Sequence, residues 1–345
     1  MKTKKQLLLT FDYELFLGKK SGSVSQCCIE PTALLLALMK KYDLKGVFFV
    51  DTSYLVTLQN YIQNPNTDPK TKQNLQTDFN AIAQQLTQMH TQGHSVFPHI
   101  HPHWLDANYD PTTHFWQLNN TQKYRFNALD QTQKNTLFEQ SIQILKQILG
   151  QNACIDAYRA GGWCIQPFAD FKPFFEQSNI KYDMSVLRNL KNMTTAQYYD
   201  FTQIPQKNIY HFENDVCTEN QNGKFKQLSI STLNINKKII FLNKIFEKVN
   251  SKLGNRSFGN GIGVESKPLE PSTTEVQKIA SLEMVSAELL NALKLPIYKH
   301  FLDRNEYMHF ISHPKMLTKH NLYCLDTFLN YATKKYQIKT NFRQF

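Results

Sequence analysis

Through the first 190 residues, short apolar runs alternate with segments of helical periodicity, and this alternation constrains the fold more than any other feature. The expected strands are residues 6–14, 46–52, 94–100, 153–162 and 181–187, and the expected helices are 31–44, 74–93, 136–150 and 167–179. Strands that alternate with helices are typical of repeated βα units, which place parallel strands in one sheet. The sequence therefore predicts an α/β fold.

The regular alternation weakens after about residue 190 and resumes near the C-terminus. Residues 211–275 contain weak strand patterns, an expected helix at 238–254 and a stretch rich in Gly, Ser, Asn and Pro. We expect this range to be an insertion beside the scaffold that influences substrate choice. A helix is expected near 274–294, a strand at 307–312 and a helix at 324–336. The prediction is one domain over 1–345, with an insertion at 211–275 before the last strand.

Charge and cysteine content narrow the function classes. The chain has 39 Lys and Arg against 28 Asp and Glu, a formal charge of +11, without an Arg-rich arm or a nucleic-acid-binding motif. This diffuse charge fits an anionic substrate or peripheral contact with an anionic membrane, and we expect no nucleic-acid partner. Six cysteines without a paired spacing indicate reduced thiols, and the first residues lack the long apolar run of a signal peptide or transmembrane segment. We therefore expect a cytoplasmic protein.

Four of the eleven histidines lie within "GHSVFPHIHPHW", residues 93–104. His99 and His103 are four residues apart, so a helical turn would place them on one face. An extended segment would instead align both with His101. Histidine pairs at such spacings are common in zinc sites. The stretch follows an expected strand, where α/β folds gather their functional groups. The spacing predicts a metal site with two or three histidine ligands.

Two carboxylates, Asp12 and Glu14, end the first expected strand in "TFDYE". Alternation along a strand places both on one face. Buried acids after an apolar run would be costly without a cation. One carboxylate could then bind the metal while the other takes a proton from water.

Five motifs together resemble the polysaccharide deacetylase family, also called the NodB-homology or carbohydrate esterase family. They are, in order, "LLLTFDYE", "GHSVFPHIHPHW", "YRAGGW", "YDMS" and "FISHP", and they span about residues 7–315. The resemblance implies a distorted (β/α) barrel and a metal-dependent hydrolase that removes an N-acetyl group from a sugar. It also implies a divalent metal, most simply zinc.

The resemblance assigns a role to each matched residue. Asp12 matches the family's general base. Tyr13 stands where a second Asp usually binds the metal, so we infer that Glu14 takes that role. The remaining residues are His99 and His103 as metal ligands, Arg159 as the partner of the base, His313 as the catalytic histidine, Asp183 as the acid that orients it, and Trp163, His101 and Tyr13 as substrate contacts.

Because no export signal is seen, the expected substrate is an N-acetylated sugar on a nucleotide or lipid carrier, a precursor of a bacterial surface polysaccharide or lipopolysaccharide. Two alternatives remain open at this point. One is a metal-free cyclic-amide hydrolase of the same superfamily. The other is a catalytically silent glycan-binding protein, which the substitution at Tyr13 would permit.

Overall fold

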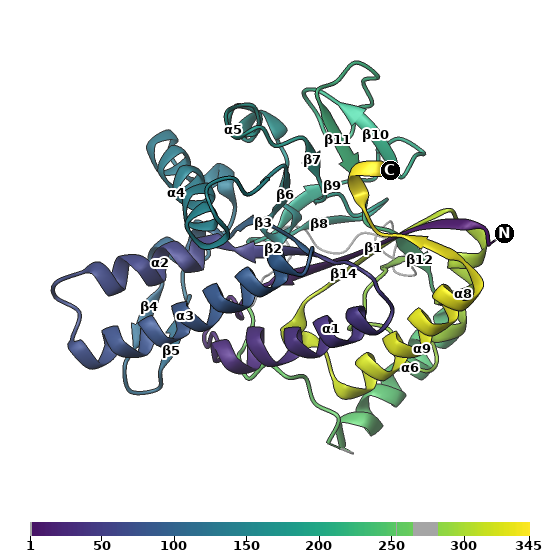
Figure 1. Cartoon of the computed structure of the whole chain (residues 1–345), viewed down its shortest axis with the longest axis horizontal. Coiled ribbons are helices and arrows are strands. Elements are labelled where there is room, and N and C mark those ends of the chain that lie inside the picture. The colour runs from purple at the N-terminus through teal and green to yellow at the C-terminus, as the bar shows by residue number, and fades with distance from the viewer. Residues whose placement is uncertain (1, 253, 265–281) are drawn as a thin grey trace.

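The computed structural model describes residues 2–252, 254–264 and 282–345, which form a mixed α/β fold around one curled sheet (Figure 1). Eight strands run across this sheet, and β15 (Gln337–Lys339) pairs with the start of β1 as the ninth. The order is β10 (Ile209–Phe212), β11 (Phe225–Leu228), β7 (Tyr182–Asp183), β6 (Ala157–Ala160), β3 (Ser95–Ile100), β2 (Val47–Asp51), β1 (Lys4–Tyr13) and β14 (Tyr307–Ser312).

All strand pairs of this sheet are parallel except β10 with β11. The chain that follows β11 also bonds to β14, the strand at the opposite end of this order. There the amide of Ser231 donates to the carbonyl of His309. The residue before Ser231 bonds in the other direction: the amide of Ile230 donates to the carbonyl of Val186, which lies just after β7. These bonds connect the ends of the curled sheet, which gives it a barrel-like form.

Helices surround the sheet, and Figure 1 shows α1, α8 and α9 on one side of it. The described helices are α1 (Glu30–Lys41), α2 (Thr52–Gln63), α3 (Pro69–Thr91), α4 (Gln131–Leu149), α5 (Lys172–Ser178), α6 (Lys237–Lys252), α8 (Leu295–Arg304) and α9 (Lys319–Lys335). The described residues also form three two-stranded sheets. They pair β4 (Asn108–Asp110) with β5 (Phe115–Gln117), β8 (Lys191–Met193) with β9 (Tyr198–Asp200), and β12 (Thr232–Asn234) with β13 (Leu282–Met284). No helix of the described ranges is long and apolar enough to cross a membrane.

Local sequence fixes several helix ends. The side chain of Asp130 accepts from the amide of Gln133 and begins α4 with a capping box, and Gly150 ends that helix at φ 104°. Thr318 begins α9 in the same way with Asn321. The side-chain amide of Asn321 also donates to the carbonyls of Glu288 and Leu290, so this cap holds the loop that precedes α8.

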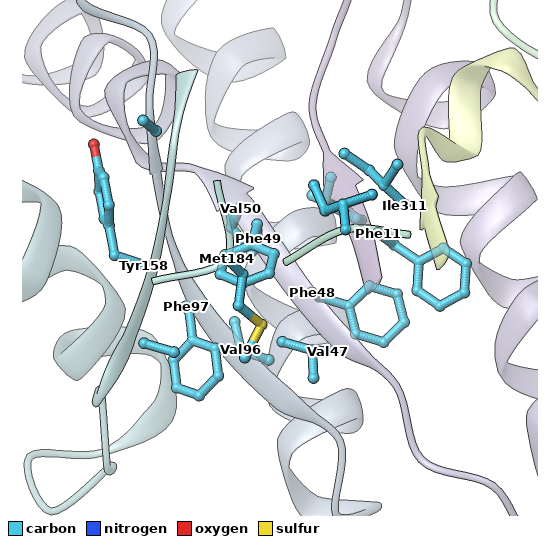
Figure 2. Close-up of a cluster of buried hydrophobic side chains, with 14 of the residues drawn as sticks. Phe11, Val47, Phe48, Phe49, Val50, Val96, Phe97, Tyr158, Met184 and Ile311 are labelled. Carbon is cyan, nitrogen blue, oxygen red and sulfur yellow. The ribbon is translucent and has the colours of Figure 1, made fainter. Parts of the chain in front are cut away.

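The core lies between the sheet and its helices, where β1, β2 and β3 bury nearly all their apolar side chains (Figure 2). Phe11 stacks on Phe48 with ring centroids 5.1 Å apart, and Phe49 packs against Phe97 at 6.0 Å. Removal of such a ring typically costs about 3–5 kcal/mol. This packing keeps the strand ends, and the polar groups on them, at fixed positions.

The α/β prediction is confirmed, but several elements differ from expectation. Helices α2 and α8 were not expected. No glycine or proline separates α2 from the strand before it, so the sequence pattern does not mark its start. In the range expected to be a helix, 274–294, the described residues form β13 and turns, and 265–281 lie outside the described residues. The expected insertion, 211–275, also needs correction: β11 pairs with β7, so its first part belongs to the main sheet.

His94, the first histidine of the cluster, has a structural role. Its Nδ1 accepts from the amide of Gly46 at 2.9 Å, and its ring meets Phe48 edge to face. Burial, followed by the charge of Lys45, lowers the pKa of His94 to about 4. The neutral ring is the form that can accept this bond.

We predict that His94 contributes a pH-dependent part of the folding free energy. The pKa in the folded state lies below the unfolded value of about 6.5, so this stability is present above pH 6.5 and is lost as the pH falls toward 4. His94→Asn keeps an acceptor but does not titrate. Urea unfolding between pH 4.5 and 7.5 should show the wild type losing roughly 1–3 kcal/mol more than the variant. Parallel curves would contradict this role.

Candidate metal centre

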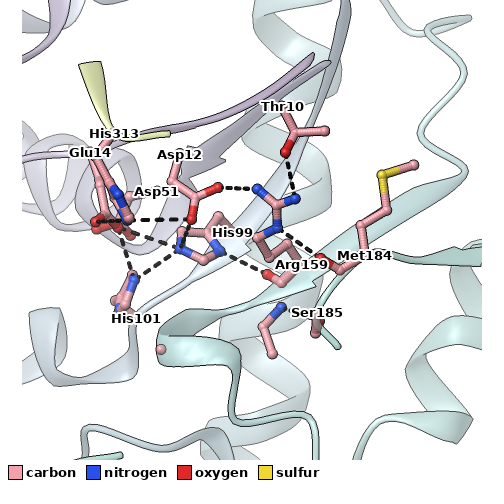
Figure 3. A network of polar contacts seen from close by, with 12 residues as sticks. Thr10, Asp12, Glu14, Asp51, His99, His101, Arg159, Met184, Ser185 and His313 are labelled. Carbon is pink, nitrogen blue, oxygen red and sulfur yellow. Dashed lines mark hydrogen bonds and ion pairs between the residues drawn. The ribbon is translucent and has the colours of Figure 1, made fainter. Parts of the chain in front are cut away.

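The carboxyl ends of the parallel strands bring the polar groups to one rim (Figure 3). Asp12 and Glu14 come from the end of β1, and His99 and His101 from the end of β3. His313 follows β14 directly. Because adjacent parallel strands end at the same edge, residues far apart in the sequence meet here.

Glu14, His99 and His101 form a buried group that could hold a metal ion through one atom of each residue, called the three-ligand group below. Glu14 Oε2 lies 2.9 Å from His101 Nε2 and 3.4 Å from His99 Nε2, and the two Nε2 atoms are 3.0 Å apart. One ligand atom from each residue lies within 4.8 Å of the others. A carboxylate oxygen and two imidazole nitrogens are a donor set suited to zinc and similar divalent ions.

The tautomer of His99 supports this use. Its Nδ1 lies 2.8 Å from the carbonyl oxygen of Arg159, which can only accept, so Nδ1 carries the proton. In the neutral ring, Nε2 then has a free lone pair that faces Glu14 and His101. Glu14 Oε2 has no hydrogen-bond partner of good geometry among the described residues. These inward-facing acceptors fit a bound divalent cation, which would satisfy them together.

His103 does not join this group, contrary to the expectation that paired it with His99. β3 and His101 are extended, which places His99 and His101 on one side, and a 3₁₀ turn then begins at Pro102. That turn carries His103 away to stack on Tyr124 at 4.9 Å, where neither of its ring nitrogens has a partner among the described residues. His103 was the expected metal ligand and His101 the expected substrate contact, whereas the geometry favours His101 as the second histidine of the group.

The "RAGGW" segment makes room for His101. A Cβ atom at Gly161 would overlap the carbonyl oxygen of Ile100 and approach His101 Nδ1 to 2.9 Å. Only glycine allows β6 and the end of β3 to lie this close. The ring of Trp163, two residues on, lies 6.4 Å from that of His313, at the rim where a substrate contact was expected.

Arg159 fixes Asp12 beside the three-ligand group. The guanidinium is fully buried, and its Nη1 donates to Asp12 Oδ1. The other oxygen, Asp12 Oδ2, lies 3.8 Å from His99 Nε2 and 3.6 Å from His313 Nε2. The expected pairing of Arg159 with Asp12 is thus present, and one carboxylate oxygen of Asp12 still faces the centre.

His313 is oriented by Glu288, not by Asp183. Glu288 Oε1 lies 2.9 Å from His313 Nδ1, and its Oε2 accepts from the His313 amide. Burial lowers the pKa of His313, but Glu288 and then Asp12 and Glu14 raise it to about 9. Asp183, which was expected in this position, instead accepts from the amide and hydroxyl of Ser185.

Lys315 is a further charged group that the sequence reasoning did not select. Its Nζ lies 2.9 Å from Glu14 Oε1 and donates to the carbonyl of Leu15. Burial would raise the pKa of Glu14, but Lys315 and His101 lower it well below its ordinary value. Lys315 follows His313 by two residues, so its place beside "FISHP" was the available signal.

Tyr13 is also placed differently from its expected role as a substrate contact. It points to the opposite side of β1 from Asp12 and Glu14, where its hydroxyl donates to Gln85 Oε1 in α3 at 2.9 Å. Strand alternation explains this position.

A pocket of about 370 Å³ opens beside the centre. The described residues that line it include Glu14, Tyr124, Glu288, His313 and Lys315.

Comparison with known proteins supports the fold alone. No protein-family model and no curated protein sequence matches the chain. A solved structure described as a "putative polysaccharide deacetylase" from Mycobacterium smegmatis aligns with TM-score 0.50 and 11% identity, over 99% of this chain and 88% of that one. The α-amylase AmyC from Thermotoga maritima aligns at TM-score 0.46 and 7% identity, over 100% and 74% of the two chains. A 4-α-glucanotransferase from Thermococcus litoralis aligns at 0.44 and 11%, over 97% and 37%.

The geometry predicts which histidine binds metal with His99. His101→Phe keeps a ring of similar size but removes a donor atom, so zinc affinity should fall at least about 100-fold. His103→Phe should keep it within about threefold, because the ring nitrogens of His103 make no bond among the described residues. Zinc titration by calorimetry, after chelator treatment, measures both. Loss of zinc in the His103 variant alone would restore the original assignment.

Proposed function

We propose that this protein is a metal-dependent hydrolase that removes an N-acetyl group from a sugar. The observation that carries the proposal is the convergence of Asp12 and His313 on the Glu14, His99 and His101 group at one strand rim. The barrel-like fold, shared with the Mycobacterium smegmatis structure, supports it. A base, an acid and a metal site are the groups that hydrolysis of an unreactive amide requires.

Glu14, His99 and His101 would hold the ion, for which we propose zinc. When bound, such an ion polarises a carbonyl group and lowers the pKa of water at the site toward ~7. The Arg159 carbonyl keeps the His99 ring in the ligating tautomer, and Ser53 accepts from the amide of His101 at 2.9 Å, which fixes the backbone there.

Asp12 is proposed as the general base. Arg159 holds Oδ1, so Oδ2 is the oxygen that can accept a proton from the attacking water. The ion pair with the buried guanidinium offsets part of the cost of burying these two side chains. Since Oδ2 lies within 4 Å of both His99 Nε2 and His313 Nε2, it faces the space where the water and the amide would meet.

His313 is proposed as the general acid. Glu288 holds Nδ1, so Nε2 is directed toward Asp12 and Glu14 and can give its proton to the departing amine. A poor leaving group such as an amine needs this proton. His313 also lines the pocket with Glu288 and Lys315, so the acid stands where a sugar could enter.

We propose that the sugar is carried by a nucleotide or a lipid, as in the synthesis of bacterial surface polysaccharide or lipopolysaccharide. The support is the positive charge of the chain, which suits a diphosphate, together with the open pocket. Gly263 and Val264, from the Gly-rich stretch, line this pocket. They would influence which sugars are accepted without taking part in the chemistry.

One observation favours the metal-free cyclic-amide hydrolase as the second candidate. The Lys315 ammonium group already pairs with Glu14 Oε1, so a cation other than a metal offsets part of the acidic charge. The two candidates differ in metal content. Metal analysis of purified protein, together with hydrolysis of cyclic amides after chelation, separates them.

We expect His313→Asn to lower the rate of acetate release by roughly 10²–10⁴, the usual value of a positioned proton donor. Zinc affinity should stay within about threefold, because His313 is outside the three-ligand group. The assay uses nucleotide-linked and lipid-linked N-acetyl sugars, with His300→Asn, at an exposed position on α8, as the matched control. Wild-type turnover by His313→Asn, or no acetate from either substrate class, would refute the proposal.

A second pair of variants tests which acid orients His313. Glu288→Gln should lower kcat by about tenfold to a hundredfold, a part of the acid's full contribution, because the charge that holds the ring is lost. Asp183→Asn should keep kcat within about threefold, since Asp183 contacts Ser185 instead. Steady-state kinetics at saturating zinc measures both. The opposite ranking would restore Asp183 as the orienting acid.

A further inference from the structure

Among the described residues, helix α6 contacts the rest of the protein through the side that carries Asn243, Phe246 and Glu247. Asn291 donates from its side-chain amide to Glu247 Oε1 at 2.9 Å and also to Asn243 Oδ1. The ring of Phe246 packs against that of His320 at 5.4 Å. In Figure 1 the helix lies at the periphery beside α9. These contacts determine which side of α6 faces outward.

The outward side of α6 is apolar. Phe241 is 65% exposed, and Leu242, Ile245 and Val249 are about half exposed. At about 100° of rotation per residue, these four side chains fall within one arc of roughly 100°. Four large apolar groups exposed together on one helix form a continuous patch, which usually marks an interaction surface.

Lysines accompany this arc. The helix contains five lysines and one acid, Glu247, which is exposed and accepts a hydrogen bond from Asn291. By the same rotation, Lys237, Lys244 and Lys248 form a row along one edge of the apolar arc, while Lys238 and Lys252 lie within the arc near the two ends of the helix. The row can extend its ammonium groups outward while the apolar side chains point into a partner.

We propose that this face of α6 docks the protein on an anionic lipid surface. A helix of this kind lies in the plane of the interface, with its apolar side chains below the headgroups and its lysines against the phosphates. A second copy of the chain fits less well, because a symmetric contact would bring two rows of lysines together. The partner is therefore identified by both properties of the face, apolar side chains and unbalanced positive charge.

The chain leads from α6 to the pocket. After the helix, the amides of Phe258 and Gly259 donate to the carbonyls of Leu317 and Lys315, both at 2.9 Å. Gly263 and Val264 then line the pocket beside His313. A docked α6 would thus hold the pocket near the lipid headgroups. Such docking would favour a lipid-linked sugar as the substrate, and this consequence rests on the proposed deacetylation. The docking itself is independent of that reaction.

Vesicle co-sedimentation of the full chain tests the docking. Wild type should bind vesicles of 70:30 phosphatidylcholine and phosphatidylglycerol at least about tenfold more tightly than phosphatidylcholine alone. Phe241→Ser/Ile245→Ser and Lys244→Glu/Lys248→Glu should each weaken binding at least about tenfold. The matched controls make comparable changes on other helices: Leu34→Ser/Tyr323→Ser for exposed apolar groups, and Lys40→Glu/Lys70→Glu for the same charge change. Both should bind within about twofold of wild type.

Equal binding to both vesicle types, no binding by wild type, or α6 variants that bind as wild type does would overturn the docking proposal. So would sedimentation equilibrium showing a wild-type dimer that the Phe241→Ser/Ile245→Ser change dissociates while vesicle binding persists. Asp12→Asn separates this proposal from the proposed reaction, because it should lose acetate release and keep vesicle binding. If wild type released no acetate yet bound anionic vesicles through α6, only the proposed function would fail.

Discussion

The buried side chain of Arg159 is the interaction on which the rim depends. Its guanidinium donates to Asp12 Oδ1, to Thr10 Oγ1 and to the carbonyl of Met184, while its own carbonyl fixes the ring of His99. It therefore connects β1, β3 and β6 with the chain after β7. A buried cation needs hydrogen-bond partners of this kind, since an unpaired charge in the core would be strongly destabilising. The same bonds that satisfy Arg159 also orient the proposed base and one proposed metal ligand.

The layered order of the site follows from this arrangement. Phe49 lies under the guanidinium at 4.2 Å, so the apolar core begins directly beneath the polar groups. On the other side of Arg159 from Phe49 lies Asp12, followed by the group formed by Glu14, His99 and His101. His313 lies at the pocket, where Glu288 holds it. Arg159 fixes Asp12 and the ring of His99. Glu288 fixes His313, and Lys315 pairs with Glu14. This explains how a dense set of charges can be held in place at the end of a largely apolar sheet.

Much of this could be predicted from sequence, because it depends on local pattern. The strands that carry Asp12, His99, Arg159 and His313 are short apolar runs, and parallel pairing brings their ends together whatever the details of the loops. Alternation along β1 also correctly placed Asp12 and Glu14 on one side. These inferences needed only the period of a strand and the rule that parallel strands end at one edge.

The errors came from features that local pattern does not determine. Whether His101 or His103 accompanies His99 depends on the residue at which the extended chain turns, and that turn begins at Pro102. Glu288 was missed because it lies in a loop whose position is set by the side chain of Asn321 from α9, a contact between distant parts of the chain. Asp183 ends β7, earlier than the strand expected at 181–187, and its carboxylate bonds to Ser185 instead of to His313.

We propose that Glu14, His99 and His101 together hold a metal ion beside Asp12 and His313. The most direct measurement is an anomalous difference map, at the zinc absorption edge, from crystals of the protein grown with zinc. We expect one strong peak, bounded by Glu14 and by the Nε2 atoms of His99 and His101. A peak at His103 instead, or no peak at the rim with Lys315 still paired to Glu14, would contradict it.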